Sequence, residues 1–325
     1  MSSPAASRGP APEIDPVETA RRLVDNVASV IRGKRPQVEL AVLALLAEGH
    51  VLIEDVPGVG KTTLARALAR SVGLDFARVQ FTSDLMPTDV LGGSIYDPAR
   101  REFELRRGPI FTNVLLADEI NRTTPKTQSA LLEAMGERRV SIDGQTHELA
   151  PPFFVVATQN PEEFYGTYPL PESQLDRFLL RIRLGYPDAS TERDVLRARR
   201  LGDPLDDLSP VATREDVLGA QAAVGEITME DSLLDYLHEI VLATRTTPLL
   251  SLGASTRAAL AFERAARAHA LIMGRSFVTP DDVKRVALAA LSHRVRVSGA
   301  DGAREDREAA ERILASLLSG IAVPV

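Results

Sequence analysis

The sequence has no cysteine among its 325 residues. This absence excludes disulfides, thiolate zinc sites and thiol catalysis, and it is compatible with a reducing cytoplasm. Apolar runs of the length that a membrane helix needs are also missing. Residues 1–13 are dominated by Pro, Ser and Ala and contain no apolar segment like that of a signal peptide. We therefore expect a disordered N-terminal tail over 1–13 and a cytoplasmic protein.

Basic residues are outnumbered as well. The chain has 38 Lys and Arg against 45 Asp and Glu, a net charge of -7. Surfaces that bind nucleic acid are usually basic, so this balance argues against nucleic acid as the main partner. With 44% hydrophobic and 26% charged residues, the chain is typical of a globular protein with one large α/β domain and a smaller second one.

Five short apolar runs have the composition of buried parallel strands. They are Val51–Glu54, Arg78–Phe81, Val114–Ala117, Phe153–Ala157 and Phe178–Leu184. Helical segments separate most of them, and two more helices precede the first run, beginning at Asp15 and near Pro36. This alternation predicts a doubly wound α/β domain with a parallel sheet over residues 14–187.

The C-terminal part of the chain has a different pattern. From about residue 188 strand patterns disappear, and helix starts accumulate at Thr213, Thr228, Ser255 and Thr279-Pro280. We therefore expect a second, all-helical domain over residues 188–325.

Two polar hairpins interrupt the α/β pattern. One pairs residues 94–96 with 102–105, and the other pairs 140–142 with 146–148 around the two-residue turn Asp143-Gly144. Neither has enough apolar surface to fold alone. Each hairpin is either surface decoration or an element that moves or binds a partner.

A glycine-rich loop joins the first apolar run to a helix. Its residues are Asp55, Val56, Pro57, Gly58, Val59, Gly60, Lys61, Thr62 and Thr63. They match the phosphate-binding P-loop, GxxxxGK[ST], except that Asp55 replaces the first glycine. In such a loop the amides and the helix N-terminus hold the phosphates, Lys61 reaches the β- and γ-phosphates, and the Thr62 hydroxyl ligates Mg²⁺. The loop therefore predicts ATP and Mg²⁺ as cofactors.

Two adjacent carboxylates end a later strand. The run Val114–Ala117 leads directly into Asp118 and Glu119. Because ligands of α/β sheets bind at the carboxyl ends of the strands, we expect both acids near the P-loop. Asp118 would hold Mg²⁺ through water, and Glu119 would orient and polarise the water that attacks the γ-phosphate. A solvated strand end would explain two acids alone, but not two acids in combination with Lys61 and Thr62.

Three more polar residues lie where they could act on a nucleotide. Asn160 ends the next strand and could hold the attacking water, although Asn before Pro is also an ordinary turn residue. Arg177 precedes the last strand and could equally form a local ion pair with Asp176. Arg257 lies in the first turn of a helix, where a cation opposes the helix dipole, which hints at an anionic partner.

Five stretches together resemble the MoxR family of AAA+ ATPases. They are residues 54–62, 116–122, 126–135, 157–160 and 166–178. The resemblance extends from about Val30 to His293 and implies an AAA+ core with a helical lid. It also implies ring oligomers, expected to be hexamers, with nucleotide bound between neighbouring subunits. In this resemblance Asn160 corresponds to sensor 1, Arg177 to the arginine finger and Arg257 to a sensor 2 that contacts the nucleotide from the lid.

The resemblance extends to other segments and to function. Residues Ile31 to Gly33 resemble the segment that lies against adenine, residues 93–107 the helix-2 insert, and residues 140–149 the pre-sensor-1 hairpin. The family implies a chaperone-like ATPase that matures protein complexes with a partner carrying a von Willebrand factor A domain. Two alternatives stay open: a nucleic-acid motor, and a nucleotide-gated scaffold with little turnover.

Overall fold

The computed structural model describes residues 15–160, 167–200, 202–299 and 303–324. The predicted tail over 1–13 lies outside these ranges. Among the helices within them, none combines the length and the apolar composition of a membrane span.

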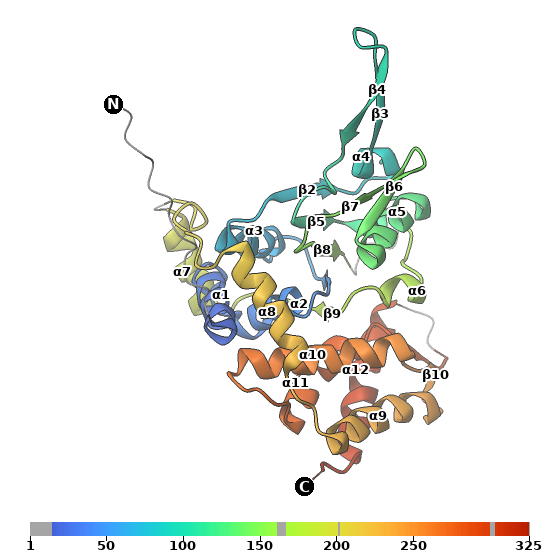
Figure 1. Ribbon diagram of the computed structural model, residues 1–325. Helices are drawn as coiled ribbons and strands as arrows, with labels where there is room; N and C mark the ends of the chain where they lie inside the picture. Colours follow the sequence, from blue (N-terminus) through green and yellow to red (C-terminus); the bar gives the residue numbers. More distant parts are fainter. Residues whose placement is uncertain (1–14, 161–166, 201, 300–302, 325) are drawn as a thin grey trace.

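Five parallel strands form the central sheet, in the spatial order β2–β5–β8–β1–β9 (Figure 1). The strands are β1 (Val51–Glu54), β2 (Phe76–Gln80), β5 (Val114–Asp118), β8 (Phe154–Gln159) and β9 (Leu180–Ile182). Each of the five predicted runs supplies one of them, so the parallel α/β sheet is confirmed. In the parallel register Glu54 lies opposite Gln159, and Gln80 opposite Asp118. The segments that follow β1, β5 and β8 therefore leave the sheet at one common edge.

Side chains alternate across the sheet into two apolar clusters. In β1, Val51 and Ile53 belong to one cluster, whereas Leu52 belongs to the other, as the two-residue period of a strand requires. The first cluster continues into the C-terminal helices, where it includes Phe262 and Val286. The sheet and the helical part thus share one continuous core, which fixes their relative position.

Helices cover both faces of the sheet. They are α1 (Pro16–Val30), α2 (Arg35–Leu46), α3 (Lys61–Val72), α4 (Pro87–Leu91), the 3₁₀ turn η1 (Ile120–Arg122), α5 (Pro125–Glu137) and α6 (Glu172–Leu175). Helix α1 begins where its capping signal predicts, because the Asp15 carboxylate accepts the Glu18 N–H at 3.2 Å.

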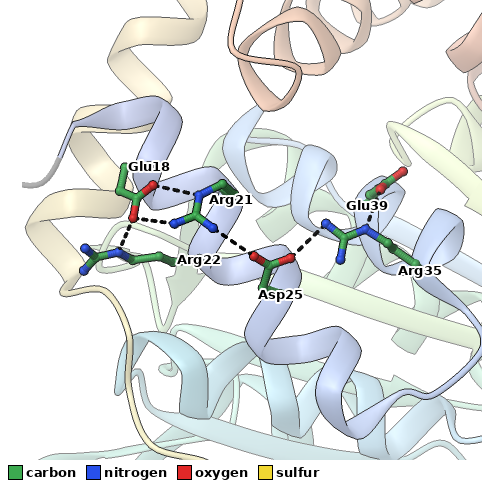
Figure 2. A network of polar contacts seen from close by, with 6 residues as sticks. All are labelled: Glu18, Arg21, Arg22, Asp25, Arg35 and Glu39. Atoms are coloured by element: carbon green, nitrogen blue, oxygen red, sulfur yellow. Dashed lines mark hydrogen bonds and ion pairs between the residues drawn. The ribbon is translucent and has the colours of Figure 1, made fainter.

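Six charged side chains join the outer faces of α1 and α2 (Figure 2). They are Glu18, Arg21, Arg22, Asp25, Arg35 and Glu39. Hydrogen bonds from Arg21 and Arg22 lower the pKa of the Glu18 carboxyl to about 2. Asp25 connects the two helices through Arg21 at 3.3 Å and Arg35 at 2.8 Å. All six side chains face solvent, where such pairs contribute little to stability.

Both predicted hairpins form. The strands β3 (Gly92–Asp97) and β4 (Glu102–Arg107) project far from the body at the top of Figure 1, whereas β6 (Arg139–Ile142) and β7 (Gln145–Glu148) stay close to it. Asp143 and Gly144 take positive φ angles of 50° and 79°, as a tight two-residue turn requires. The Asp143 carboxylate accepts the Ser94 N–H at 3.1 Å, so the second hairpin is tied to the base of the first.

The C-terminal part is helical with one small exception. Its helices are α7 (Ala189–Arg199), α8 (Arg214–Glu226), α9 (Asp231–Thr246), α10 (Thr256–Ile272), α11 (Pro280–Leu291) and α12 (Ala303–Gly320). The strands β10 (Leu250–Leu252) and β11 (Arg296–Val297) pair as a short antiparallel ribbon that the all-helical prediction did not include. We refer to residues 231–324 as the lid, coloured orange to red in Figure 1.

One predicted helix start is wrong. Thr228 does not cap a helix, because its N–H donates to the Ser276 carbonyl at 2.9 Å and its own carbonyl accepts the Val278 N–H at 2.9 Å. These bonds form a bridge to the segment between α10 and α11, and α9 begins three residues later at Asp231. The starts at Thr213, Ser255 and Thr279 are confirmed.

Candidate nucleotide site

The loop between β1 and α3 is open on its outer side. Gly58 and Gly60 have φ angles of +87° and +96°, which side chains other than glycine rarely adopt. A Cβ atom added at either position would have no neighbour within 4 Å. The glycines are therefore required by the backbone angles, and the space above the loop is free for a phosphate chain. Lys61 begins α3, and its Nζ donates to the Asp55 carbonyl at 2.7 Å.

Asp55 has a role that the usual glycine could not have. Its carboxylate accepts the Val56 N–H at 2.9 Å and the Gly185 N–H at 2.6 Å. The second bond ties the start of the P-loop to the segment that follows β9. The departure from the P-loop pattern is thus explained by a tertiary contact, which a search for the pattern alone could not reveal.

The carboxylates of Asp118 and Glu119 are held by side chains from neighbouring strands. The Thr158 hydroxyl donates to Asp118 Oδ1 at 2.6 Å and accepts the Glu119 N–H at 2.9 Å. Arg78 Nη2 donates to Asp118 Oδ2 at 2.7 Å. Glu119 itself has a φ of 58°, a left-handed conformation that is uncommon outside glycine and is often found at functional sites. Thr158 therefore holds the carboxylate of Asp118 and the backbone at Glu119.

Glu119 is also restrained at its carboxylate. Gln80 Nε2 and Arg122 Nη1 donate to Glu119 Oε2 at 2.7 and 2.9 Å. Sequence reasoning did not single out Thr158, Arg78, Gln80 or Arg122. For Thr158 and Gln80 a signal existed, because each is a polar residue in the last two positions of a strand. These strands, β8 and β2, are the two neighbours of β5.

The residues of this edge fit a bound magnesium ion. Thr62, in the first turn of α3, and Asp118, at the end of β5, offer oxygen atoms, which Mg²⁺ prefers. No group of three or more His, Cys, Asp or Glu side chains suited to a metal occurs among the described residues. A site of this kind leaves most positions around the ion to phosphate and water, as is usual for Mg²⁺ in nucleotide sites.

Asn160 follows β8 directly and shares this edge. It lines a cavity of about 240 Å³ between the sheet and the lid, together with Glu54, Arg181 and Arg307. The proposed adenine segment lies between α1 and α2. Ile31 is buried, and a Cβ atom on Gly33 would lie 3.0 Å from Thr191, so the chain passes close to α7 there.

An aromatic side chain that sequence reasoning passed over lies near the predicted adenine segment. Tyr186 is 72% exposed, and its carbonyl accepts Lys34 Nζ at 2.7 Å. Lys34 directly follows Gly33 in the chain. Tyr186 is therefore an exposed aromatic residue whose backbone is tied to the residue that follows the predicted adenine segment.

Arg177 and Arg257 lie at the opposite edge of the sheet. Both line a cavity of about 290 Å³ together with Gly49 and His50, which immediately precede β1. The P-loop follows β1, and four strand residues at about 3.3 Å each separate the two edges by roughly 13 Å. In this arrangement Arg257 therefore lies away from the P-loop of its own chain and beside Arg177. The structure therefore does not place Arg257 where it could contact a nucleotide bound to the P-loop of its own chain, as the resemblance implied.

Arg177 is not the ion-pair partner of Asp176. The Asp176 carboxylate pairs with Arg294 instead, at 2.9 Å from Oδ1 to Nε. Arg177 Nη1 donates to the Leu132 carbonyl near the end of α5 at 2.7 Å. It packs so closely on α5 that a Cβ atom on Gly136 would lie 2.3 Å from it. The alternative in which Arg177 serves only as a local partner for Asp176 is wrong.

The cavity around Arg177 has an excess of positive charge. It is lined by Arg138, Arg177, Arg257, Arg264 and Arg294, against the carboxylates of Glu48 and Asp176. His50 adds no charge near neutral pH, because burial lowers its pKa to about 4. Burial also lowers the pKa of Arg294 to about 10, which leaves it charged. A cationic, partly open cavity of this kind suits a polyanion.

The chain has clear relatives. A family described as "ATPase family associated with various cellular activities (AAA)" matches residues 50–180, and a family described as "AAA lid domain" matches residues 242–317. The chain is 42% identical to Chaperone MoxR1 of Mycobacterium tuberculosis over 99% of its own length and 86% of the relative's. It is 50% identical to the uncharacterized protein YeaC of Bacillus subtilis over 94% of both chains.

A crystal structure has the same fold. It is that of a Cytophaga hutchinsonii protein provisionally described as an ATPase. The TM-score is 0.85 with 36% identity, over 95% of this chain and 96% of that one.

Proposed function

This chain belongs to the MoxR family of AAA+ ATPases, and we propose that it binds ATP with Mg²⁺ at the carboxyl edge of its sheet and hydrolyses the γ-phosphate. The observation that carries this proposal is the meeting of three strand ends at one edge. The P-loop follows β1, the pair Asp118-Glu119 ends β5, and Asn160 follows β8. Phosphoryl transfer requires positioning and charge neutralisation rather than covalent chemistry, and these groups supply both.

Each residue of the site has a distinct role in this proposal. The backbone amides of the loop from Gly58 to Thr63, which includes Val59 and follows Pro57, hold the phosphates. Lys61 neutralises their charge, and Ile31 and Gly33 flank the adenine. Thr62 and Asp118 hold Mg²⁺, which supplies further charge neutralisation when bound. Glu119 and Asn160 orient the attacking water. Because Gln80 and Arg122 hold the Glu119 carboxylate, the carboxylate must be released or redirected before it can act on water.

We further propose that a second copy of the chain completes each site. Arg177 and Arg257 face away from their own P-loop and line a cationic cavity. If neighbouring subunits meet head to tail, this cavity faces the γ-phosphate on the next subunit. Such contacts generate a closed ring, expected to be a hexamer. Arginine supplied in trans in this way stabilises the charge that develops during transfer.

In cells, we propose, the protein acts as a chaperone that assembles or matures protein complexes, as the name of its M. tuberculosis relative indicates for that protein. A partner with a von Willebrand factor A domain and a cytoplasmic location follow only from the family resemblance and the composition. A tagged Glu119→Gln variant should trap clients in ATP, because it binds nucleotide without turnover. Lys61→Ala in the same pull-down is the matched control. Identical bound proteins in the two would argue against ATP-dependent client binding.

One observation favours a nucleic-acid motor as a second candidate. The hairpin β3–β4 carries the aromatic pair Tyr96–Phe103, with Phe103 74% exposed, next to Arg100 and Arg101. Exposed aromatics with arginines are common in single-strand binding sites. Salt-dependent binding of single-stranded DNA, together with stimulation of ATPase activity, would favour this candidate over the chaperone. Single-turnover hydrolysis separates both from a scaffold without turnover.

A further inference from the structure

The backbone on both sides of Arg177 is held by the lid. Arg294, which follows α11, pairs with the Asp176 carboxylate at 2.9 Å. Its Nη2 donates to the Asp176 carbonyl at 3.2 Å and to the Phe178 carbonyl at 2.8 Å. The Arg294 side chain is only 2% exposed. One buried guanidinium therefore contacts the residue before Arg177 and the residue after it.

Two more lid side chains contact the same turn. His293 Nε2 donates to the Phe178 carbonyl at 2.9 Å. Ser255 Oγ, which caps α10 by accepting the Ala258 N–H at 3.0 Å, donates to Asp176 Oδ2 at 3.1 Å. These contacts come from the start of α10 and the end of α11. The two helices pack on each other through buried residues such as Phe262, so the side chains that contact the turn keep their positions relative to one another.

The far end of Arg177 is attached to a different part of the molecule. Its guanidinium donates to the Leu132 carbonyl of α5, on the core. The lid thus contacts the backbone on both sides of Arg177, and the core holds the same turn through the Leu179 N–H, which donates to the His50 carbonyl at 2.8 Å. Because the tip of Arg177 is bonded separately to α5, loss of the lid contacts would leave the direction of the guanidinium less tightly set.

We propose that Arg294 is a positioning residue that sets the reach of Arg177 into the nucleotide site of the neighbouring subunit. The lid of one subunit thereby controls ATP hydrolysis in the next. This inference rests on the proposed role of Arg177 in trans. Arg294 suits the task because its planar guanidinium donates to the Asp176 and Phe178 carbonyls while it pairs with the Asp176 carboxylate, a combination that a compact lysine ammonium would not reproduce.

The experiment compares Arg294→Met with Arg267→Met. Arg267 is the control, because it also joins a lid helix to backbone carbonyls, those of Gly225 at 3.4 Å and Ile227 at 2.5 Å, which are not part of the Arg177 turn. Its side chain is 25% exposed, against 2% for Arg294, so urea unfolding of both variants accompanies the comparison. Displacement of a catalytic group by about 1 Å can cost roughly 10²-fold in rate. We expect Arg294→Met to lower kcat about 10- to 100-fold with ATP affinity unchanged, and Arg267→Met to leave kcat unchanged.

Mixed rings identify the site that is affected. Arg294→Met mixed with Lys61→Ala should regain activity, because the Lys61→Ala subunit offers an intact Arg177 turn to an intact P-loop. Mixed with Arg177→Ala it should gain no activity, since neither subunit then supplies a correctly placed arginine. The opposite pattern would show that Arg294 acts on its own P-loop, and it would overturn the inference.

Two further measurements keep the outcome decisive. If Arg294→Met does not fold, Asp176→Asn replaces it, because this isosteric change removes the charge of the carboxylate that pairs with Arg294. Asp176→Asn should likewise regain activity with Lys61→Ala and gain none with Arg177→Ala. Arg177→Ala mixed with Lys61→Ala tests the role in trans alone. Failure of that mixture overturns the proposed function. Its success, combined with no rescue of Arg294→Met by Lys61→Ala, overturns only the inference about Arg294.

Discussion

Substitution of Glu54, the last residue of β1, should destabilise the fold strongly. Its carboxylate is 3% exposed and lies 3.3 Å from Arg181 Nη1 and 3.3 Å from Arg307 Nε. It also accepts a hydrogen bond from Gln159 on β8. One carboxylate thus neutralises two guanidinium groups and joins β1, β8, β9 and the lid helix α12 immediately before the P-loop.

The variant Glu54→Gln keeps the shape of the side chain and removes its charge. Removing one partner of a buried ion pair costs about 3–5 kcal/mol, because the remaining charge is left without compensation. Arg181 retains Glu311 at 2.9 Å, so we expect the lower end of this range, about 3 kcal/mol of unfolding free energy.

Urea unfolding followed by circular dichroism measures this loss. The matched control is Glu18→Gln, which also takes a carboxylate from two arginines, but in the exposed network of Figure 2. That control should leave the unfolding midpoint unchanged within error. A loss below about 1 kcal/mol for Glu54→Gln would refute the claim that the buried carboxylate joins lid and core.

Three other predictions concern the site and its surroundings. Lys61→Ala should abolish ATP binding, whereas Glu119→Gln should retain binding and lose hydrolysis, because Lys61 contacts the ground-state phosphates and Glu119 acts on water. Calorimetry measures the affinities, and an equal loss of ATP affinity in both variants would contradict these separate roles. Thr158→Val should slow steady-state phosphate release about tenfold, since its hydroxyl bonds both the Asp118 carboxylate and the Glu119 N–H, and loss of such a bond costs about 1–3 kcal/mol. An unchanged kcat would remove Thr158 from the site. His50 has its pKa lowered to about 4 by burial, so the unfolded chain binds more protons between about pH 6.5 and pH 4, and the unfolding free energy should fall as the pH falls through that window. Urea titrations across this range should show a shallower pH dependence for His50→Gln, and an identical slope would contradict the assignment.

The sequence predicted those features that depend on neighbouring residues. Five apolar runs identified the strands, and the caps at Thr213, Ser255 and Thr279 were found because capping side chains bond within three residues. Thr228 has the same local signal, but a bridge to Phe277 uses its backbone instead. A contact nearly 50 residues away along the chain thus overrides the local preference, and no local pattern reveals it.

The site shows the same division. The P-loop and the acids of β5 could be read as motifs, whereas Thr158 and Gln80 became apparent only once the strands were aligned. The position of Arg257 depends on how the lid packs against the sheet through the shared core. The sequence therefore identified the residue but could not predict at which edge of the sheet it lies. Arg294 has no motif, because its role comes from three oxygen atoms that only the fold brings together.

The most direct test of the account is ATP hydrolysis by rings that mix Arg177→Ala with Lys61→Ala subunits. An arginine supplied in trans contributes roughly 10³–10⁵ in rate, or about 4–7 kcal/mol, so each variant alone should be nearly inactive. Native mass spectrometry establishes that mixed rings form. The account predicts that such rings regain ATPase activity, because a Lys61→Ala subunit places its intact Arg177 beside the intact P-loop of its neighbour. Mixed rings that form and remain inactive would contradict it.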